Sequence, residues 1–188
     1  MVSASSLAPA TFDAEVEVTN AVRTATADGS SAVRIEHDGE SITVVGAIPP
    51  LARGERVHLV GRWQTDRRLG RQICADAVTP VEPMGSYAVE HYLSSIRHIG
   101  PARARALVIR HARAVIEVLD ADPASCFAGL RGMSARAATE AAASWQEHRT
   151  LRALHLLLAP RGLAHLVSEE WRRYGPAAVH RASSLRHP

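Results

Sequence analysis

The first half of the chain alternates apolar and polar residues over short stretches that turn residues separate. Five stretches are rich in β-branched residues and predict β-strands: 14–19, 32–36, 41–48, 56–64 and 71–81. Asp28-Gly29 and Asp38-Gly39 are typical of tight hairpin turns, and Leu69-Gly70 marks the turn before the last strand. Five strands can close on one another without help from helices, so we expect a small barrel.

The pattern changes near residues 82–86, where alanine and leucine at helical spacing replace the alternation. Helices are expected over 87–97, 102–111, 114–119, 123–130, 135–159, 163–174 and 177–183. The breaks between them are short and rich in glycine and proline, so neighbouring helices should pack as hairpins. The expected fold class is α+β, with two modules. The first is a small barrel, and the OB-fold is the commonest small barrel with five strands. The expected limits are a flexible tail over 1–12, a barrel over 13–82, a linker over 83–86 and a helical domain over 87–188.

Composition removes several classes of enzyme. With 46% hydrophobic and 22% charged residues the chain is globular, and all 22 of its basic residues are arginine. Without lysine it can build neither a nucleotide-hydrolysing P-loop nor a Schiff-base site, so we expect no catalytic activity. The charges are also unevenly distributed between the two halves. Residues 1–85 contain eight Arg and eleven Asp or Glu, whereas residues 86–188 contain fourteen Arg and eight Asp or Glu, so the first half is net negative and the second net positive.

No cofactor, metal or membrane segment is expected. Cys74 and Cys126 form no CxxC pair, which favours a reduced, cytoplasmic setting. His148 and His155 share a helix face but lack further ligands nearby. No apolar run is long enough to span a membrane, and the start of the chain has neither the basic nor the apolar region of a signal peptide.

The segment Ser95-Ile96-Arg97-His98-Ile99-Gly100-Pro101-Ala102-Arg103-Ala104-Arg105 is typical of a helix-hairpin-helix turn. Glycine at the turn admits a phosphate close to the backbone, and the free N–H groups of the next helix point outward. Such contacts bind DNA irrespective of base identity. The alternative is an ordinary helix corner with Ile99 in the core. The candidate DNA-binding residues here are Arg97, Ile99, Gly100, Pro101, Ala102, Arg103 and Arg105.

Two later breaks repeat this arrangement about 30 residues apart, Leu130-Arg131-Gly132-Met133-Ser134 and Pro160-Arg161-Gly162-Leu163-Ala164. Ser134 and Ala164 stand where a second glycine would allow the closest phosphate approach. The second and third turns are therefore either weaker binders or only structural. Their candidate residues are Gly132, Ser134, Arg136, Arg161 and Gly162.

The barrel offers its own candidate surface near the last turn: Arg62, Trp63, Arg67, Arg68 and Arg71. Proteins that bind single strands combine a basic groove with aromatic platforms. Against this, the barrel half carries a net negative charge and has only Phe12 and Trp63 as aromatic residues. Trp63, at an alternating position, is alternatively a core residue.

Short motifs in a consistent order extend over nearly the whole chain: Ile42-Thr43-Val44-Val45-Gly46, Pro49-Pro50-Leu51, Gly61-Arg62-Trp63, Tyr92-Leu93-Ser94-Ser95, Ile99-Gly100-Pro101 and Arg173-Tyr174-Gly175. Together they resemble the N-terminal region of RecD-like DNA helicases, the branch that works without RecB and RecC. The resemblance implies an OB domain, tandem helix-hairpin-helix elements and a link to DNA repair and recombination. The motor domains of that family have no counterpart in these residues, so helicase activity does not carry over.

The leading hypothesis is a non-catalytic protein that binds single-stranded, duplex or forked DNA without sequence specificity. The alternative is an interaction module that docks a helicase or a single-strand-binding protein, or a degenerate remnant of a helicase. That alternative predicts an exposed apolar patch around Leu151, Leu154, Leu157 and Leu158. A small stand-alone enzyme is a third hypothesis, for which no coherent catalytic set is present.

Overall fold

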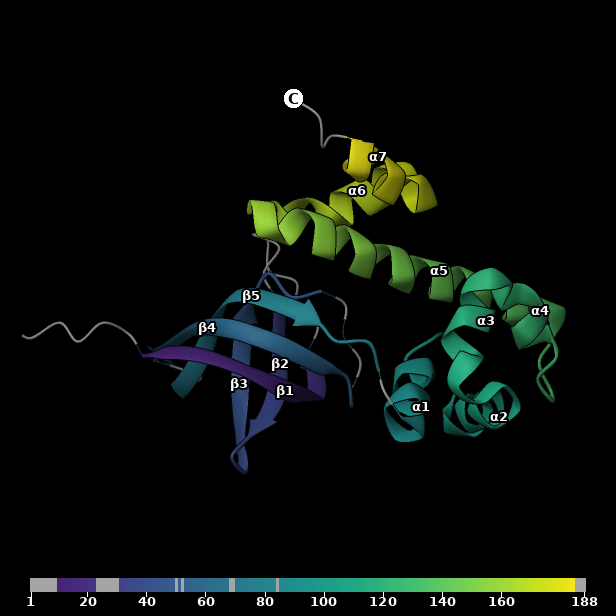
Figure 1. The fold of residues 1–188 in the computed structure, drawn as a ribbon, viewed down its shortest axis with the longest axis horizontal. Helices are drawn as coiled ribbons and strands as arrows, with labels where there is room; N and C mark the ends of the chain where they lie inside the picture. Colours follow the sequence, from purple (N-terminus) through teal and green to yellow (C-terminus); the bar gives the residue numbers. More distant parts are fainter. Residues whose placement is uncertain are drawn as a thin grey trace, which may run out of the picture.

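The computed structural model describes residues 10–22, 31–49, 51, 53–67, 70–83 and 85–184. The first half is a closed barrel with the strand order β1-β2-β3-β5-β4 (Figure 1). Its strands are β1 (Thr11–Val22), β2 (Ser31–His37), β3 (Glu40–Gly46), β4 (Arg56–Asp66) and β5 (Gly70–Pro80). All neighbouring strands pair antiparallel except β3 and β5, which are parallel.

The alternation of the sequence sets the inside and outside of the barrel. Every second residue of a strand faces the core, so Val16 and Val18 pack against Ile35 and Leu59 while their polar neighbours face water. β1 begins at Thr11, so Thr11 and Phe12 belong to the barrel and not to the expected tail. Phe12 is buried because its ring meets those of His37 and Trp63 edge-on, at centroid distances of 4.9 and 5.7 Å.

The second half is helical, which confirms the expected α+β class with two modules. Its α-helices are α1 (Ser86–Ser94), α2 (Pro101–His111), α3 (Val115–Ala121), α4 (Pro123–Ala128), α5 (Ala135–Leu158), α6 (Val167–Tyr174) and α7 (Ala178–Ser184). Short 3-10 turns connect several of them: η1 (Ala112–Ala114), η2 (Ala159–Arg161), η3 (Ala164–Leu166) and η4 (Gly175–Ala177). The helix expected over 163–174 is therefore shorter, because a 3-10 turn occupies its start.

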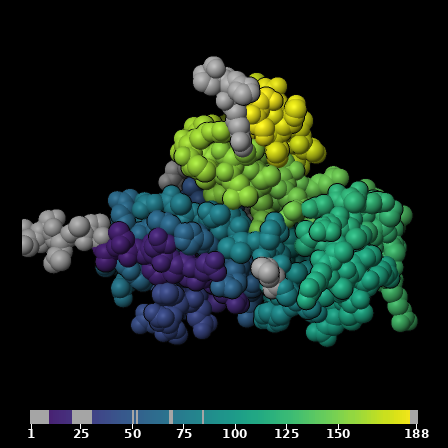
Figure 2. Space-filling view, viewed as in Figure 1, coloured from purple at the N-terminus to yellow at the C-terminus, as the bar shows by residue number. Residues whose placement is uncertain are grey.

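The long helix α5 joins the parts of the molecule. Its N-terminal half packs through Ala138, Ala141 and Trp145 into one core with α1 to α4. Its C-terminal half packs through Leu154 and Leu158 into a second core with α6 and α7. Figure 1 shows α5 extending from the α1–α4 group across the barrel near β5, with α6 and α7 on its far side, and Figure 2 shows the barrel and helices in close contact.

The barrel is attached to α5 by buried polar contacts. Arg152 donates to Glu55 at 2.8 Å, with side chains only 4% and 1% exposed. One turn further, His155 Nε2 donates to the carbonyl of Val78 on β5 at 3.1 Å. Burial lowers the pKa of His155, so the ring is held neutral. These contacts fix the position of α5, and hence of the helical turns at its N-terminus, relative to the barrel.

Candidate nucleic-acid interface

Two turns of the helical half share one backbone geometry. In the first, between α1 and α2, the Ile99 amide donates to Ile96 O at 3.0 Å; in the second, between α4 and α5, the Met133 amide donates to Leu130 O at 3.1 Å. The residue before each donor has a left-handed backbone, with φ 65° at His98 and 68° at Gly132. The residue after each donor, Gly100 or Ser134, is extended and precedes the helix. The two turns therefore correspond residue for residue in these features at a spacing of 34 positions.

Gly100 leaves the start of α2 open. Its φ of −81° suits any residue, and a Cβ placed on it would meet nothing within 4 Å. Neither its conformation nor its packing therefore requires glycine. The N–H groups of Gly100, Ala102 and Arg103 donate to no residue in the part of the chain that the structure describes, as expected for the first turn of a helix. This turn thus presents amides and a positive helix dipole on an unobstructed surface.

The start of α5 is less open. The hydroxyl of Ser134 accepts a hydrogen bond from the Ala137 amide at 3.2 Å and so caps the helix. One of the amides that a phosphate would use is therefore already bonded. Within the described residues, the Ala135 and Arg136 amides have no acceptor.

Arg103 ties the two turns together. Its guanidinium donates to His98 O at 2.9 Å and to Gly132 O at 3.0 Å, so one side chain bonds the left-handed residue of each turn. The sequence suggests Arg103 as a phosphate ligand, and that role stays a prediction. Ile99 is 1% exposed and its amide is bonded, so neither its side chain nor its N–H reaches the surface.

Three further arginines around the turns, Arg97, Arg105 and Arg136, are exposed and paired with acids. Arg105 lies 3.4 Å from Glu90. Arg97 and Arg136 both contact Glu140 on α5, at 3.4 and 2.9 Å. Two hydrogen bonds lower the pKa of the Glu140 carboxyl, and the one from His98 has a larger effect than the one from Arg136. Pro101 and Ala102 are exposed beside them.

The third turn differs from the other two. Gly162 is left-handed, with φ 70°, but Leu163 after it has φ −103° and ψ 18° and leads into the 3-10 turn η3. No extended residue precedes a regular helix, so the outward amides of the first two turns are not reproduced. The Arg161 side chain donates to Leu157 O at 3.1 Å and caps the end of α5. Arg161 and Gly162 are exposed, but their local structure is not that of a phosphate-binding turn.

The barrel candidates divide between the core and the surface. Trp63 is partly buried against the barrel core, and the guanidinium of Arg71 lies 3.8 Å from its ring centroid. Arg62 forms a two-pronged ion pair with Asp76, with distances of 3.1 and 2.8 Å. Arg67 is exposed, and Arg68 lies outside the described residues. Trp63 is thus packed on one side and covered by a cation on the other.

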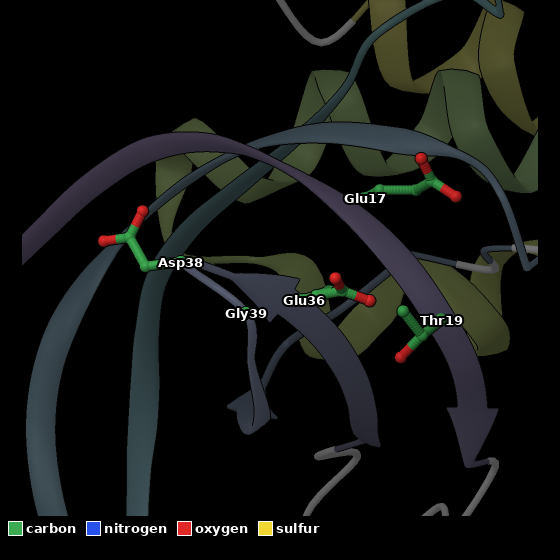
Figure 3. A pocket seen from close by; sticks show the side chains of 5 residues that line it. All are labelled: Glu17, Thr19, Glu36, Asp38 and Gly39. Carbon is green, nitrogen blue, oxygen red and sulfur yellow. The ribbon is translucent and has the colours of Figure 1, made fainter.

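Another part of the barrel surface is acidic. A shallow pocket of about 270 Å³ between β1 and the β2–β3 turn is lined by Glu17, Thr19, Glu36, Asp38 and Gly39 (Figure 3). Three carboxylates in one depression repel phosphate. If DNA contacts the barrel, its path avoids this pocket.

Other sites are not supported by the described residues. Among them, no three His, Cys, Asp or Glu side chains are grouped as a metal site would require. His148 bonds the Tyr92 hydroxyl at 3.2 Å and His155 bonds β5, so the two have separate structural partners. No helix in the part of the chain that the structure describes is both long enough and apolar enough to cross a bilayer.

Two residues of the interface were not found by sequence reasoning, His98 and Glu140. An alignment of the two turns at the 34-residue spacing would have paired His98 with Gly132. It would thus have shown a histidine at a position where the other turn has glycine. Nothing in the sequence indicates Glu140, because its contact with His98 joins residues 42 positions apart.

The strand order, with its one parallel pair, defines an OB-fold barrel, in agreement with the expected fold. Residues 25–83, which contain β2 to β5, match the family model described as the OB-fold domain of the ATP-dependent DNA helicase YrrC. No curated protein matches the chain. The match supports nucleic-acid binding as the role of this domain and agrees with the resemblance to a DNA-helicase family. It describes the OB-fold domain of that family and ends before the helical half.

Proposed function

We propose that this protein is a non-catalytic DNA-binding module that holds the sugar-phosphate backbone at two helix-hairpin-helix turns. The observation that carries the proposal is Gly100, a glycine that neither the backbone nor the packing requires. It lies beside helix N-terminal amides that have no acceptor among the described residues. A missing side chain there admits a phosphate oxygen to the amides of α2. Because amides read no base edges, binding is independent of sequence.

The distribution of charge supports the helical half as the main DNA-binding surface. Arg97, Arg105 and Arg136 are 67%, 68% and 90% exposed around the two turns. The barrel instead presents the acidic pocket, and its exposed Arg62 is neutralised by Asp76. The barrel therefore adds a secondary contact at most, near Arg67 and Arg71.

By its likeness to a helicase OB-fold domain, the proposed setting is DNA repair or recombination in the cytoplasm. The chain would act as an accessory element that holds DNA while another protein or domain performs the chemistry. Backbone contacts of this kind suit single-stranded, duplex and forked DNA.

The test is fluorescence anisotropy of labelled single-stranded, duplex and forked DNA at low and moderate salt, with an acidic non-nucleic polymer as competitor. We expect binding that weakens steeply with salt and that the polymer does not reproduce. Gly100→Val places a side chain over the amides and should weaken binding at least tenfold, with the fold preserved. Ala143→Val, on an exposed part of α5, is the matched control and should leave binding unchanged. Equal affinity of the two variants would refute the assignment.

The docking-module hypothesis is weakened, because the exposed apolar patch that it predicts is at least half buried. Leu154 and Leu158 are buried, and Leu151 and Leu157 pack against the same core. Of the four residues that should have formed an exposed patch, none projects freely into water. A helicase or single-strand-binding protein as partner therefore stays a proposal without a defined surface.

A further inference from the structure

The carboxylate of Glu140 contacts three side chains at the place where the two turns meet. One oxygen of Glu140 accepts a hydrogen bond from His98 Nε2 at 2.7 Å and lies 3.4 Å from the Arg97 guanidinium. The other oxygen accepts from Arg136 Nε at 2.9 Å. Arg97 and His98 come from the first turn, and Arg136 from the start of α5 after the second. Two guanidinium groups and an imidazole thus surround a single negative charge.

His98 occupies its position at a conformational cost. Its φ of 65° lies in the left-handed region, where a side chain costs on the order of 1 kcal/mol, and the equivalent residue of the second turn is Gly132. Glycine would satisfy this turn without strain. What histidine adds is the imidazole, and the imidazole lies on Glu140. Such strain is common at functional sites, which points to a role for the ring.

The donors around Glu140 are those that a phosphate needs. Guanidinium and imidazole N–H groups bind carboxylate and phosphate oxygens with the same geometry. Arg97 and Arg136 are largely exposed, whereas the Glu140 side chain is 26% exposed, so a ligand can reach the arginines from solvent. Arg103 holds the two turns together and keeps this arrangement in place.

We propose that Arg97, His98 and Arg136 form a phosphate subsite shared by the two turns, and that Glu140 masks it in the free protein. A DNA phosphate takes the place of the carboxylate on these donors when the amides at Gly100 engage the neighbouring backbone. This inference rests on the proposed DNA binding and adds to it a composite subsite with an internal competitor.

The test compares Glu140→Gln with Glu147→Gln by anisotropy on the same labelled DNA over a series of salt concentrations. Glu147 is exposed on the same helix and carries the same charge. Glu140→Gln should bind DNA at least threefold more tightly than Glu147→Gln. The slope of log affinity against log salt concentration should become steeper by about one to two, because each freed arginine that contacts a phosphate adds about 0.9 to this slope. Adding Arg136→Ala to Glu140→Gln should remove most of this gain.

A second variant tests the ring without risk to the fold. His98→Gly relieves the left-handed strain, so the protein should be at least as stable in urea as the wild type. In the Glu140→Gln background it should weaken binding two- to fivefold. Failure of the wild type to bind DNA would refute the proposed function itself. Binding by the wild type, with Glu140→Gln equal to or weaker than Glu147→Gln, would overturn only the masked subsite.

Discussion

Ala112, the first residue of η1 directly after α2, adopts a backbone conformation that favours glycine. Its φ of 49° and ψ of −127° are close to those of Gly175, which likewise begins η4 directly after α6. The methyl group of Ala112 is strained there by roughly 1 kcal/mol. We expect Ala112→Gly to raise the free energy of unfolding by about 0.5–1 kcal/mol, measured by urea denaturation, because relief of strain exceeds the added freedom of the unfolded chain.

The matched control for this residue is Ala106→Gly. Ala106 is exposed in the middle of α2, where glycine costs about 1 kcal/mol relative to alanine. The two substitutions are chemically identical and should have opposite signs. A loss of stability in both variants would show that Ala112 carries no strain.

At the scale of elements, the pairing of β1 with β2 places two like charges opposite each other. Glu17 and Glu36 are direct partners in this antiparallel pair, and both are exposed on the acidic pocket. Opposed like charges on neighbouring strands destabilise a sheet by a few tenths of a kcal/mol or more. Glu36→Arg should therefore stabilise the barrel by roughly 0.5–1 kcal/mol at low salt, measured by chemical denaturation.

The control for this variant is Glu15→Gln on β1, the strand that also carries Glu17. Glu15 pairs with Arg56 at 2.8 Å, so removing its charge should slightly destabilise the protein. Both effects should shrink at high salt, because exposed charges are screened. A Glu36→Arg variant less stable than the wild type at low salt would contradict the argument.

The elements of this fold were predictable where local patterns decide them, and the interface was not. Alternation identified the barrel strands because inward side chains such as Val16 and Val57 are each followed by an exposed polar residue. Glycine marked both candidate phosphate-binding turns, and proline followed it in the first. The contacts of Arg103 and Glu140 were not predictable, because they join residues 29 and 42 positions apart and depend on how the two turns pack. Trp63 could not be assigned to core or surface until its neighbours were placed.

At the scale of the whole molecule, the ion pair of Glu55 with Arg152 connects the barrel to α5. Both side chains are buried, and the Arg152 guanidinium also lies 5.2 Å from the Tyr92 ring centroid. Removing one partner leaves a charge in the interior, so Arg152→Met should cost about 3–5 kcal/mol in urea unfolding. The double variant Glu55→Leu with Arg152→Met should be less destabilised than the single one. A larger loss in the double variant would show that the pair is not the main contact of this joint.

The same joint should make the stability of the molecule depend on pH through His155. Burial lowers the pKa of this ring below the ordinary histidine pKa of about 6.5. At a pH just below 6.5, His155 therefore binds a proton less often in the folded protein than in the unfolded chain. Stability contributed by the neutral ring is therefore present above that value and is lost as the pH falls below it. Urea denaturation at pH 7.5, 6.5 and 5.5 should show this loss in the wild type and a smaller one in His155→Gln, whose amide can still donate to Val78 O. An equal pH dependence in the two proteins would exclude His155 as its source.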